Sequence, residues 1–344
     1  MKGFFNDKNV LVTGATGFLG YWLTKALVRE KAQIVILVRD HDPQSTLIQS
    51  DLIQQTRVIH GALEDFVSVE RAINEHEIDT VFHLGAQTIV GTALRNPLST
   101  FESNIRGTYN LLEACRQHKN LVKRIVVASS DKAYGSSPTL PYTEEMPLRG
   151  QHPYDVSKSC TDLLSDTYHH TYGLPIVIAR CGNLYGGGDL NWSRLIPGTI
   201  KNFHSHIAPV IRSDGTYTRD YLYVEDAAQA YLMLAFHANK ENVRGQAFNF
   251  GPNKPYSVLE IVSSLQRLMG RSDLAPQIRN EAKEEIRNQS LDSQKARKIF
   301  DWQPLFTLEE GLQHTINWYR NYFKNMLTED TTYESRKRKL PLLP

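Results

Sequence analysis

The chain has 344 residues, of which 41% are hydrophobic and 22% are charged. This composition is typical of a globular protein, and the length allows one large domain or two smaller ones. The 39 Lys and Arg residues nearly balance the 37 Asp and Glu residues, so no overall field draws the protein to nucleic acid or to a membrane surface.

The amino-terminal sequence MKGFFNDKNV has acidic and amide residues where a signal peptide needs an unbroken apolar stretch. No window reaches the roughly eighteen consecutive apolar residues of a membrane helix. Cys115, Cys160 and Cys181 are scattered and include no C-x-x-C pair, which fits a reducing compartment better than a disulfide framework. The sequence therefore predicts a soluble cytoplasmic protein.

Short β-branched runs alternate with helical stretches over the first 180 residues. The predicted strands are Asn9–Thr13, Gln33–Val38, Thr56–His60, Thr80–Leu84, Arg124–Ser129 and Pro175–Arg180. The clearest predicted helices are Phe18–Glu30, Val67–His76, Pro97–His118 and Tyr154–Tyr172. This alternation predicts an α/β fold with a Rossmann-type, doubly wound parallel sheet, which binds its ligands at the carboxyl ends of the strands.

Beyond Gly186–Gly188 the sequence mixes Gly, Asp, Pro and aromatic residues with short strands and helices. This texture predicts a smaller carboxy-terminal α/β lobe that determines substrate specificity. We expect an NAD(P)-binding domain over residues 1–182 and a mainly substrate-binding lobe over 183–325, with segments that return to the first domain. Periodicity is lost from Met326 onward, so residues 326–344 are expected to form a flexible tail.

A glycine-rich loop follows the first predicted strand. The sequence GATGFLG places Gly14, Gly17 and Gly20 before a helix, where glycine permits a tight turn, a close approach to a pyrophosphate and close helix packing. The helix amino terminus supplies free N–H groups for the phosphates. An ordinary Gly-rich turn is the alternative. We expect a dinucleotide to contact Gly14, Thr16, Gly17, Phe18, Leu19 and Gly20.

The second predicted strand ends in the sequence ILVRD. An arginine at this place pairs with the 2′-phosphate of NADP, whereas an acidic residue accepts hydrogen bonds from the ribose hydroxyls of NAD. Arg39 comes first and Asp40 second, so the sequence favours NADP and keeps NAD open. Arg39 as a plain loop charge is the alternative.

Tyr154 and Lys158 are four residues apart on a predicted helix and so share one face. A Lys⁺ beside a phenol favours the phenolate, which lowers the tyrosine pKa toward a range useful for proton abstraction. Ser129 and Ser130 end the preceding strand, at the edge that faces the cofactor cleft. The helix face and the strand end together predict a catalytic site at this edge of the sheet.

These motifs, GATGFLG, HLGAQ, the strand-end serine and YDVSK, resemble the extended short-chain dehydrogenase/reductase superfamily over roughly residues 8 to 320. The resemblance implies a Ser130, Tyr154 and Lys158 triad, an NAD(P) cofactor and a nucleoside-diphosphate sugar as substrate. It also implies cofactor contacts at Leu63, Leu84 and Ala86. The chain departs from the family pattern at Gly85 and Ala62, where relatives carry alanine and aspartate.

The residues after the strand-end serine separate the reactions of this superfamily, and here they are Asp131 and Lys132. An Asp-Lys pair at this place resembles the CDP-glucose type of sugar-nucleotide 4,6-dehydratase. Lys132 is then the base that removes the C-5 hydrogen, and Asp131 is the acid for the departing 6-hydroxyl. These roles need a lysine pKa lowered and an aspartate pKa raised by desolvation, which an ion pair between them opposes. A surface turn with a helix cap is the alternative.

The stretches HLGAQTIV, GN-x-x-GGGD, RLIP and RDYLYVED resemble substrate-binding segments of the same enzymes. They imply substrate contacts at Gln87, Asn183, Arg194 and Arg219. The helices Pro97–His118 and Tyr154–Tyr172 resemble those of the superfamily's four-helix dimer interface, so a homodimer is expected.

The sequence thus predicts an NDP-sugar 4,6-dehydratase acting on CDP-glucose or a similar sugar nucleotide. The alternatives are an NDP-sugar 4-epimerase or another NDP-sugar oxidoreductase, and a non-catalytic cofactor-binding protein of the same fold. The pairs His204 with His206 and His169 with His170 lack the spacing and the carboxylate of a zinc site, so no metal is expected.

Overall fold

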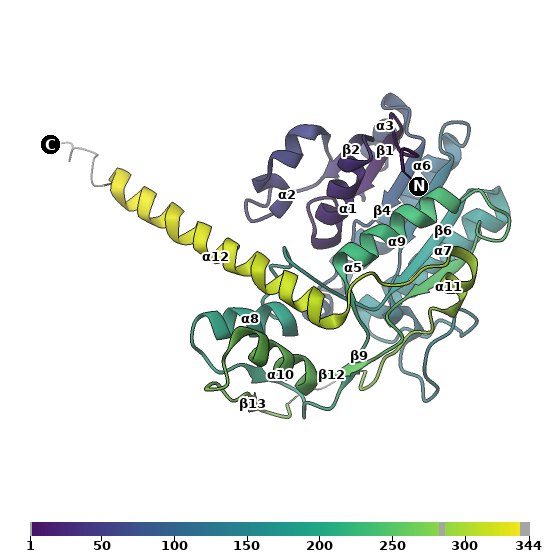
Figure 1. Ribbon diagram of the computed structural model, residues 1–344. Helices are drawn as coiled ribbons and strands as arrows, with labels where there is room; N and C mark the ends of the chain where they lie inside the picture. Colours follow the sequence, from purple (N-terminus) through teal and green to yellow (C-terminus); the bar gives the residue numbers. More distant parts are fainter. Residues whose placement is uncertain (1, 282–285, 338–344) are drawn as a thin grey trace.

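A sheet of seven parallel strands forms the centre of the molecule in the computed structural model, which describes residues 2–281 and 286–337 (Figure 1). The strand order is β11-β6-β5-β4-β1-β2-β3. The strands are β1 Asn9–Thr13, β2 Gln33–Val38, β3 Thr56–His60, β4 Thr80–His83, β5 Arg124–Ala128, β6 Ile176–Cys181 and β11 Ala247–Phe250. The first three have the predicted bounds, β4 and β5 each end one residue earlier than predicted, and β6 is shifted by one residue at both ends.

Both faces of this sheet are covered by helices. In β1, Val10 and Val12 face one apolar core and Leu11 faces the other, as the alternation of side chains along a strand requires. The first core is covered by α1 Phe18–Arg29 and α9 Val224–His237, and the second by α3 Phe66–Glu75, α6 Gly107–Gln117 and α7 Pro153–Tyr172. This arrangement confirms the predicted doubly wound α/β fold.

The strand register brings the carboxyl ends of the central strands to one edge. Thr13 pairs with His83 across β1 and β4, and Ala128 pairs with Ala179 across β5 and β6. The chain runs outward from β1 to β3 and then returns to β4, so β1 and β4 flank the point where the strand order reverses. Open α/β sheets bind their ligands at this point.

The predicted helix over 97–118 is divided into three consecutive segments. They are α5 Pro97–Phe101, the π-helical turn η2 Glu102–Arg106, and α6. Asn96 caps the start of α5, where its Oδ1 accepts a hydrogen bond from the Ser99 N–H at 3.1 Å. Other short helices near the site are α2 Thr46–Gln49, η1 Asp51–Gln55, α4 Val90–Arg95 and η3 Asp131–Tyr134.

A smaller lobe lies beside the sheet and is built around aromatic side chains. Its helices are α8 Leu195–His204, α10 Val258–Met269 and α12 Leu308–Lys337. Its strand pairs are β7 Asn183–Tyr185 with β10 Tyr221–Tyr223, β9 Thr218–Arg219 with β12 Tyr256–Ser257, and β8 Val210–Ile211 with β13 Gln277–Ile278. Phe203, Tyr223 and Tyr319 are buried in its core. The chain returns from this lobe to the first one through α9, β11 and α11 Gln294–Phe300, which packs on the large sheet.

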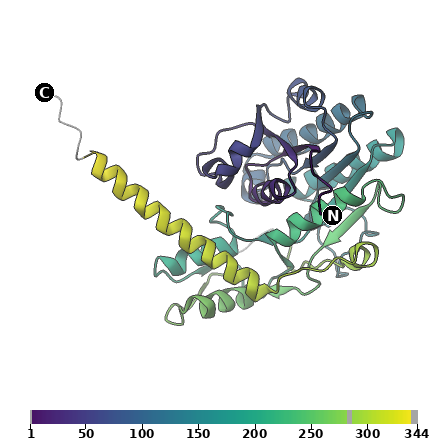
Figure 2. The same cartoon turned by 45° about the horizontal axis from the view of Figure 1, so that its top comes forward.

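Helix α12 packs on the smaller lobe at its start, through Leu312 and Tyr319, and then extends away from both lobes in two views (Figures 1 and 2). The sequence lost its periodicity at Met326, yet the backbone stays helical as far as Lys337. Residues 338–344, the end of the expected flexible tail, lie outside the described residues. Flexibility of this segment stays a prediction.

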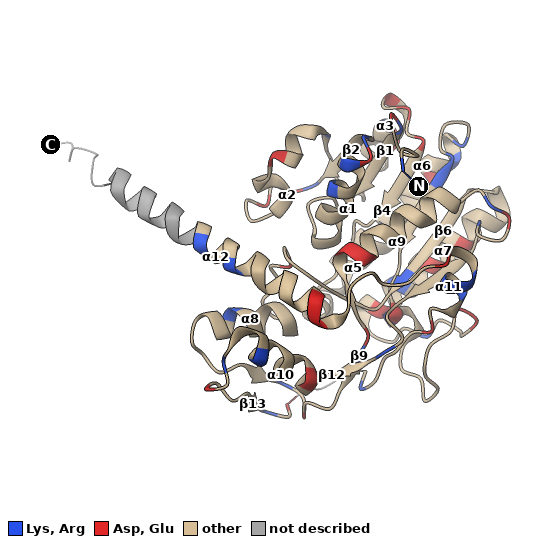
Figure 3. Cartoon of the chain, in the orientation of Figure 1, with Lys and Arg blue, Asp and Glu red and all other residues tan. Residues whose placement is uncertain are grey.

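Charged residues of both signs are distributed over both lobes (Figure 3). This mixture agrees with the small formal charge of the chain, +2. Within the part of the chain that the structure describes, no helix combines the length and the apolar character needed to span a bilayer.

Candidate active site

The turn between β1 and α1 has the geometry of a phosphate-binding loop. Gly14 has a φ of +70°, and a Cβ on it would lie 2.7 Å from the Gly85 backbone nitrogen. A Cβ on Gly20 would lie 2.1 Å from the Gly14 carbonyl oxygen, so helix α1 packs directly on the turn. A Cβ on Gly17 would meet only that same oxygen, at 3.2 Å. The outer side of the turn is thus open to a phosphate at the start of α1, which fits a dinucleotide.

His83, at the end of β4, connects this loop to the core. Its Nδ1 is 2.9 Å from the Thr13 hydroxyl and its Nε2 is 3.0 Å from the Thr108 hydroxyl. Burial, together with the charge of Lys158, lowers the pKa of His83 to about 3, so the ring is neutral at physiological pH. A Cβ on Gly85 would lie 2.7 Å from the Leu63 side chain, which gives a physical reason for glycine where relatives carry alanine.

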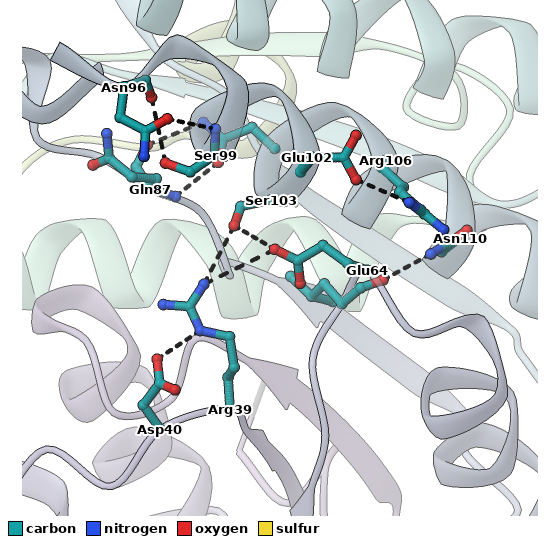
Figure 4. A network of polar contacts seen from close by, with 12 residues as sticks. Arg39, Asp40, Glu64, Gln87, Asn96, Ser99, Glu102, Ser103, Arg106 and Asn110 are labelled. Atoms are coloured by element: carbon teal, nitrogen blue, oxygen red, sulfur yellow. Dashed lines mark hydrogen bonds and ion pairs between the residues drawn. The ribbon is translucent and has the colours of Figure 1, made fainter. Parts of the chain in front are cut away.

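Arg39 follows β2, and its side chain extends toward Glu64, which follows β3, and toward Ser103, which lies in η2 (Figure 4). Its Nε donates to Asp40 at 2.6 Å, and one of its terminal nitrogens is 3.4 Å from the Ser103 hydroxyl and 3.9 Å from Glu64. Ser103 donates in turn to Glu64 at 2.6 Å. Arg39 therefore lies where the adenosine ribose is expected, but two carboxylates already face it.

Ser130 and Tyr154 meet at the end of β5. Ser130 begins η3, where its hydroxyl donates to Asp131 at 3.0 Å and accepts from the Lys132 N–H at 3.3 Å. Tyr154 lies in the first turn of α7 and is only 8% exposed. Burial raises its pKa to about 12, against the opposing effects of a hydrogen bond with Ser130 and the charge of Arg194. The structure thus brings the predicted serine and tyrosine into contact.

Lys158 lies one turn further along α7 but is directed to the strand end. Its Nζ donates to the Ala128 carbonyl oxygen at 2.7 Å. Burial lowers its pKa to about 8, and Asp162 opposes that shift. The sequence predicted that Lys158 lowers the pKa of Tyr154, and this prediction is wrong. The cation that lowers this pKa is Arg194, and its effect is smaller than the opposing effect of burial.

A buried ion pair lies behind Lys158 and was not predicted. Arg180 in β6 donates to Asp162 at 2.8 Å and to the Tyr134 hydroxyl at 2.8 Å, and Ser129 also donates to Asp162. All of these groups are buried, which makes their mutual hydrogen bonds necessary. The only sequence signal was the i,i+4 spacing of Lys158 and Asp162.

Asp131 and Lys132 lie beside this site in η3. Asp131 is 3% exposed, and burial raises its pKa, with Lys132 acting in the opposite direction. The Nζ of Lys132 donates to Oε1 of Gln289 at 3.0 Å. Asp155, buried next to Tyr154, also has its pKa raised by burial and lowered by the charge of Lys132. The pair is thus part of a polar cluster in which Asp131 is buried and Lys132 half-buried, and a surface turn is excluded for Asp131.

A cavity of about 290 Å³ opens beside this cluster. Its walls come from the end of η3, the start of α7 and a segment of the smaller lobe. The lining residues are Gly135, Ser136, Gln151, His152, Asp155, Ile286 and Arg287. Both lobes therefore contribute to the space in front of the cluster, as expected for a ligand site.

The four predicted substrate residues differ in the hydrogen bonds that they already make within the protein. The Gln87 side chain folds back on its own loop, bonding to the Ile89 backbone and to Thr100. Asn183 holds its place in β7, where its N–H donates to the Asp220 carbonyl. Arg194 begins α8 and donates to Asp189 at 3.0 Å.

Arg219, the fourth, is buried in β9 and donates to the carbonyl oxygens of Ile286 and Arg287 at 2.5 and 2.9 Å. Its charge lowers the pKa of Asp131, so it faces the cluster from the smaller lobe. The structure therefore brings Arg194 and Arg219 toward Tyr154 and Asp131, while Gln87 has its polar atoms committed elsewhere.

The histidine pairs considered for metal binding are occupied in other ways. His204 stacks on Phe323 with ring centroids 4.4 Å apart, and Nδ1 of His169 lies 2.7 Å from the Leu174 carbonyl oxygen. Across residues 2–281 and 286–337, no group of three His, Cys, Asp or Glu side chains is placed to hold a metal ion.

Comparison with known proteins places this site in a family. The family model described as GDP-mannose 4,6 dehydratase matches residues 11–315. The chain is 29% identical over 338 residues to CDP-glucose 4,6-dehydratase of Salmonella typhimurium, with 94% of this chain and 93% of the relative covered. It is 30% identical over 323 residues to UDP-glucuronate 4-epimerase of Thermodesulfobacterium geofontis, with 90% and 95% covered.

Among solved structures, dTDP-glucose 4,6-dehydratase from Streptomyces venezuelae with NAD bound matches with a TM-score of 0.83. The identity is 26%, and the match covers 91% of this chain and 97% of that one. These findings agree with the resemblance to the extended short-chain dehydrogenase/reductase superfamily. The chain therefore belongs to the GDP-mannose 4,6 dehydratase family.

Proposed function

We propose that the protein is an NDP-sugar 4,6-dehydratase that converts a nucleoside-diphosphate hexose to its 4-keto-6-deoxy form. One observation carries the proposal. Asp131 and Lys132 lie in one polar cluster with Ser130 and Tyr154, at the carboxyl end of β5, and Asp131 and Tyr154 are buried in it. An acid and a base beyond the Tyr–Ser pair are what elimination needs and what simple oxidation at C-4 does not.

In this mechanism Tyr154 acts as the phenolate, which the hydrogen bond with Ser130 and the charge of Arg194 favour against burial, and takes the proton of the sugar 4-hydroxyl. Ser130 donates a hydrogen bond to the reacting oxygen. A nicotinamide cofactor, when bound, would supply a hydride acceptor for C-4 and a hydride donor for C-6. Because the C-4 ketone acidifies the neighbouring hydrogen, Lys132 can remove the proton from C-5. Asp131 gives a proton to the 6-hydroxyl, which leaves as water, and Lys132 returns a proton to C-5 when C-6 is reduced.

The mechanism needs a protonated Asp131 and a neutral Lys132. A protonated Asp131 with a neutral Lys132 carries the same number of protons as the ion pair, so the two states differ only in where one proton resides. Burial favours the neutral state, since it raises the pKa of Asp131. The active state therefore requires no change in total charge.

The cofactor of this proposal is NAD, although Arg39 alone favoured NADP. Asp40 and Glu64 lie 2.6 and 3.9 Å from the Arg39 guanidinium, and a 2′-phosphate would bring further negative charge next to both. Ribose hydroxyls, in contrast, can donate to either carboxylate. The similar dehydratase from Streptomyces venezuelae was solved with NAD.

The substrate of this proposal is CDP-glucose or a similar sugar nucleotide, in line with the relative from Salmonella typhimurium. Arg194 and Arg219 suit the diphosphate, because a guanidinium can bond to two oxygens at once. Contacts of Asn183 and Gln87 with the substrate stay predictions, and Gln87 would first have to release its bonds to Ile89 and Thr100.

A 4-epimerase is the second candidate, favoured by the 30% identity with UDP-glucuronate 4-epimerase. It would use Ser130, Tyr154 and Lys158 in the same way and leave Asp131 and Lys132 without a chemical task. The two activities therefore differ in whether the C-5 hydrogen exchanges with solvent.

Incubation of the protein and NAD with CDP-, dTDP-, UDP- and GDP-glucose in deuterated water separates them. A dehydratase yields a 4-keto-6-deoxy sugar with deuterium at C-5, detected by mass spectrometry and NMR. Recovery of only the C-4 epimer, without deuterium, would overturn the dehydratase proposal in favour of the epimerase.

Three further expectations belong to this proposal. The division into residues 1–182, 183–325 and 326–344 assigns cofactor binding to the first lobe and sugar binding mainly to the second. A homodimer is supported by exposed apolar side chains on α5, α6 and α7, at Leu98, Tyr109 and Leu163. A cytoplasmic location is supported by the three free cysteines.

A further inference from the structure

Gln289 reaches the catalytic cluster from the other lobe. It lies 157 residues beyond Lys132 in the sequence, yet its Oε1 accepts a hydrogen bond from Lys132 Nζ at 3.0 Å. Its side chain is completely buried. It lies just after Ile286 and Arg287, which line the cavity.

The backbone around Gln289 is held on both sides. Its N–H donates to the Thr218 carbonyl at 3.1 Å, and the Thr218 N–H donates to the Arg287 carbonyl at 3.2 Å. On the following side, the Tyr142 N–H donates to the Ser290 carbonyl at 2.8 Å. The Gln289 carboxamide is therefore presented to Lys132 from a fixed backbone, which is what a positioning residue requires.

The other end of the same carboxamide meets Tyr142. A hydrogen bond between Gln289 and Tyr142 acts to lower the pKa of that tyrosine, against the larger effect of burial. A buried carboxamide that has polar contacts at both ends is restricted to one orientation. The Gln289 oxygen is therefore held toward Lys132 by the contact at its other end as well as by its backbone.

We propose that Gln289 is a positioning residue that directs the Lys132 amine toward C-5 of the sugar through a neutral acceptor. This inference rests on the proposed dehydratase function. An amide oxygen accepts one N–H and leaves the nitrogen lone pair to the substrate. A carboxylate in its place would favour the ammonium form, which has no lone pair and cannot act as a base.

Other charged groups also face Lys132 from the surrounding elements. Asp131 lies next to it on η3, and Asp155 lies on α7 with His152 beside it. Arg219 on β9 faces Asp131, and Arg287 lies on the cavity wall. The protonation of Lys132 depends on all of these, so the test compares variants that change only residue 289.

The experiment uses Gln289→Glu and Gln289→Met, with Gln277→Glu as a control for the same charge change at an exposed position of β13. Each full-length protein is loaded with NAD and given whichever of CDP-, dTDP-, UDP- and GDP-glucose the wild type dehydrates. Two rates are followed from pH 6 to pH 9: reduction of the nicotinamide, which reports oxidation at C-4, and deuterium exchange at C-5.

Gln289→Glu is expected to shift the rising limb of the C-5 exchange rate to higher pH, by about one pH unit or more. Gln289→Met is expected to slow C-5 exchange by about tenfold or more without that shift, because orientation is lost but no charge is added. Neither variant should slow nicotinamide reduction comparably, and Gln277→Glu should match the wild type in both rates.

Unchanged C-5 exchange in both variants, with an active wild type, would overturn the positioning role alone. Equal loss of both rates would also overturn it, because a purely structural residue behaves in that way. Gln289→Met keeps the test decisive if Gln289→Glu does not fold. A wild type that dehydrates none of the four nucleotides would instead refute the proposed function.

Discussion

At the scale of single residues, the proposed mechanism divides two chemical tasks between neighbouring groups. It assigns the oxidation at C-4 to Tyr154 and Ser130, and the elimination to Asp131 and Lys132. Ser130 caps η3 just after β5, Asp131 and Lys132 lie in η3, and Tyr154 lies in α7. Replacing one member of each pair should therefore stop different steps.

Lys132→Met is predicted to slow loss of water by about 100- to 10,000-fold, the usual contribution of a general base. Nicotinamide reduction should continue, because Tyr154 and Ser130 are unchanged. Absorbance of the reduced nicotinamide and NMR of the sugar measure the two steps. Tyr154→Phe should abolish both, and Lys119→Met, an exposed lysine, should change neither. Full dehydratase turnover in Lys132→Met would remove this lysine from the mechanism.

His83 gives the fold a predicted sensitivity to acid. Its pKa is about 3 in the folded protein and about 6.5 in the unfolded chain, so between these values the unfolded state binds one more proton. The contribution of a neutral His83 is present above pH 6.5 and is lost as the pH falls, by about 1.4 kcal/mol for each unit well below 6.5.

Urea unfolding of wild type and His83→Gln at pH 7 and pH 5 checks this. The wild type should lose stability relative to the variant on going to pH 5, whereas His60→Gln, at an exposed histidine, should follow the wild type. An equal stability difference at both pH values would show that His83 is not the acid-sensitive group.

Sequence motifs were sufficient to locate Tyr154 and Lys158 on one helix face and Ser130 at a strand end. Their roles as a triad come from the family resemblance and stay predictions. Gln289 could not be predicted, since it belongs to no motif and reaches Lys132 only through the folding of the second lobe. The direction of the Lys158 side chain also depended on the carbonyl it meets at Ala128.

At the scale of elements, the turn between β1 and α1 depends on close packing of backbone on backbone. Gly20→Ala would place a Cβ 2.1 Å from the Gly14 carbonyl oxygen, so the start of α1 must shift. We predict a loss of about 1 to 3 kcal/mol in unfolding free energy and weaker NAD binding. Calorimetry of NAD binding and thermal unfolding measure the two effects.

Gly91→Ala in α4 is the matched control. A Cβ there meets nothing closer than 3.5 Å, so this change should stabilise the helix by about 0.5 to 1 kcal/mol and leave NAD binding unaltered. NAD affinity of wild-type strength in Gly20→Ala would show that this contact does not position the phosphate loop.

Element prediction succeeded where a period extends over many residues and failed where it does not. The strands β1 to β6 and helix α1 follow clear patterns. Strand β11, AFNF, lies outside the alternating strands and helices of the first 180 residues and is defined by its pairing with β6. The π-helical turn η2 inside the helix predicted over 97–118 has no periodic signature, although its Ser103 and Asn104 contact Glu64 and Gln87.

At the scale of the whole molecule, the site depends on the two lobes meeting. The first lobe supplies Ser130, Tyr154 and the phosphate loop, and the second supplies Arg219 and the segment from Ile286 to Gln289. Thr218 and Arg219 join that segment to the lobe by backbone and side-chain hydrogen bonds. Movement between the lobes would therefore change the cavity and the Lys132 contact together.

The apolar surface of α5 and α7 leads to the last prediction. Leu98 and Leu163 are 68% and 59% exposed, on helices that pack against each other. In a dimer these side chains would be buried, and a carboxylate in their place would have to be buried as well. The wild type should therefore sediment as a dimer at micromolar concentration, and Leu98→Glu with Leu163→Glu should sediment as a monomer. Leu305→Glu, which changes a leucine that is 75% exposed elsewhere, should stay dimeric. A wild-type monomer throughout this range, or a dimer that survives both substitutions, would exclude this face as the interface.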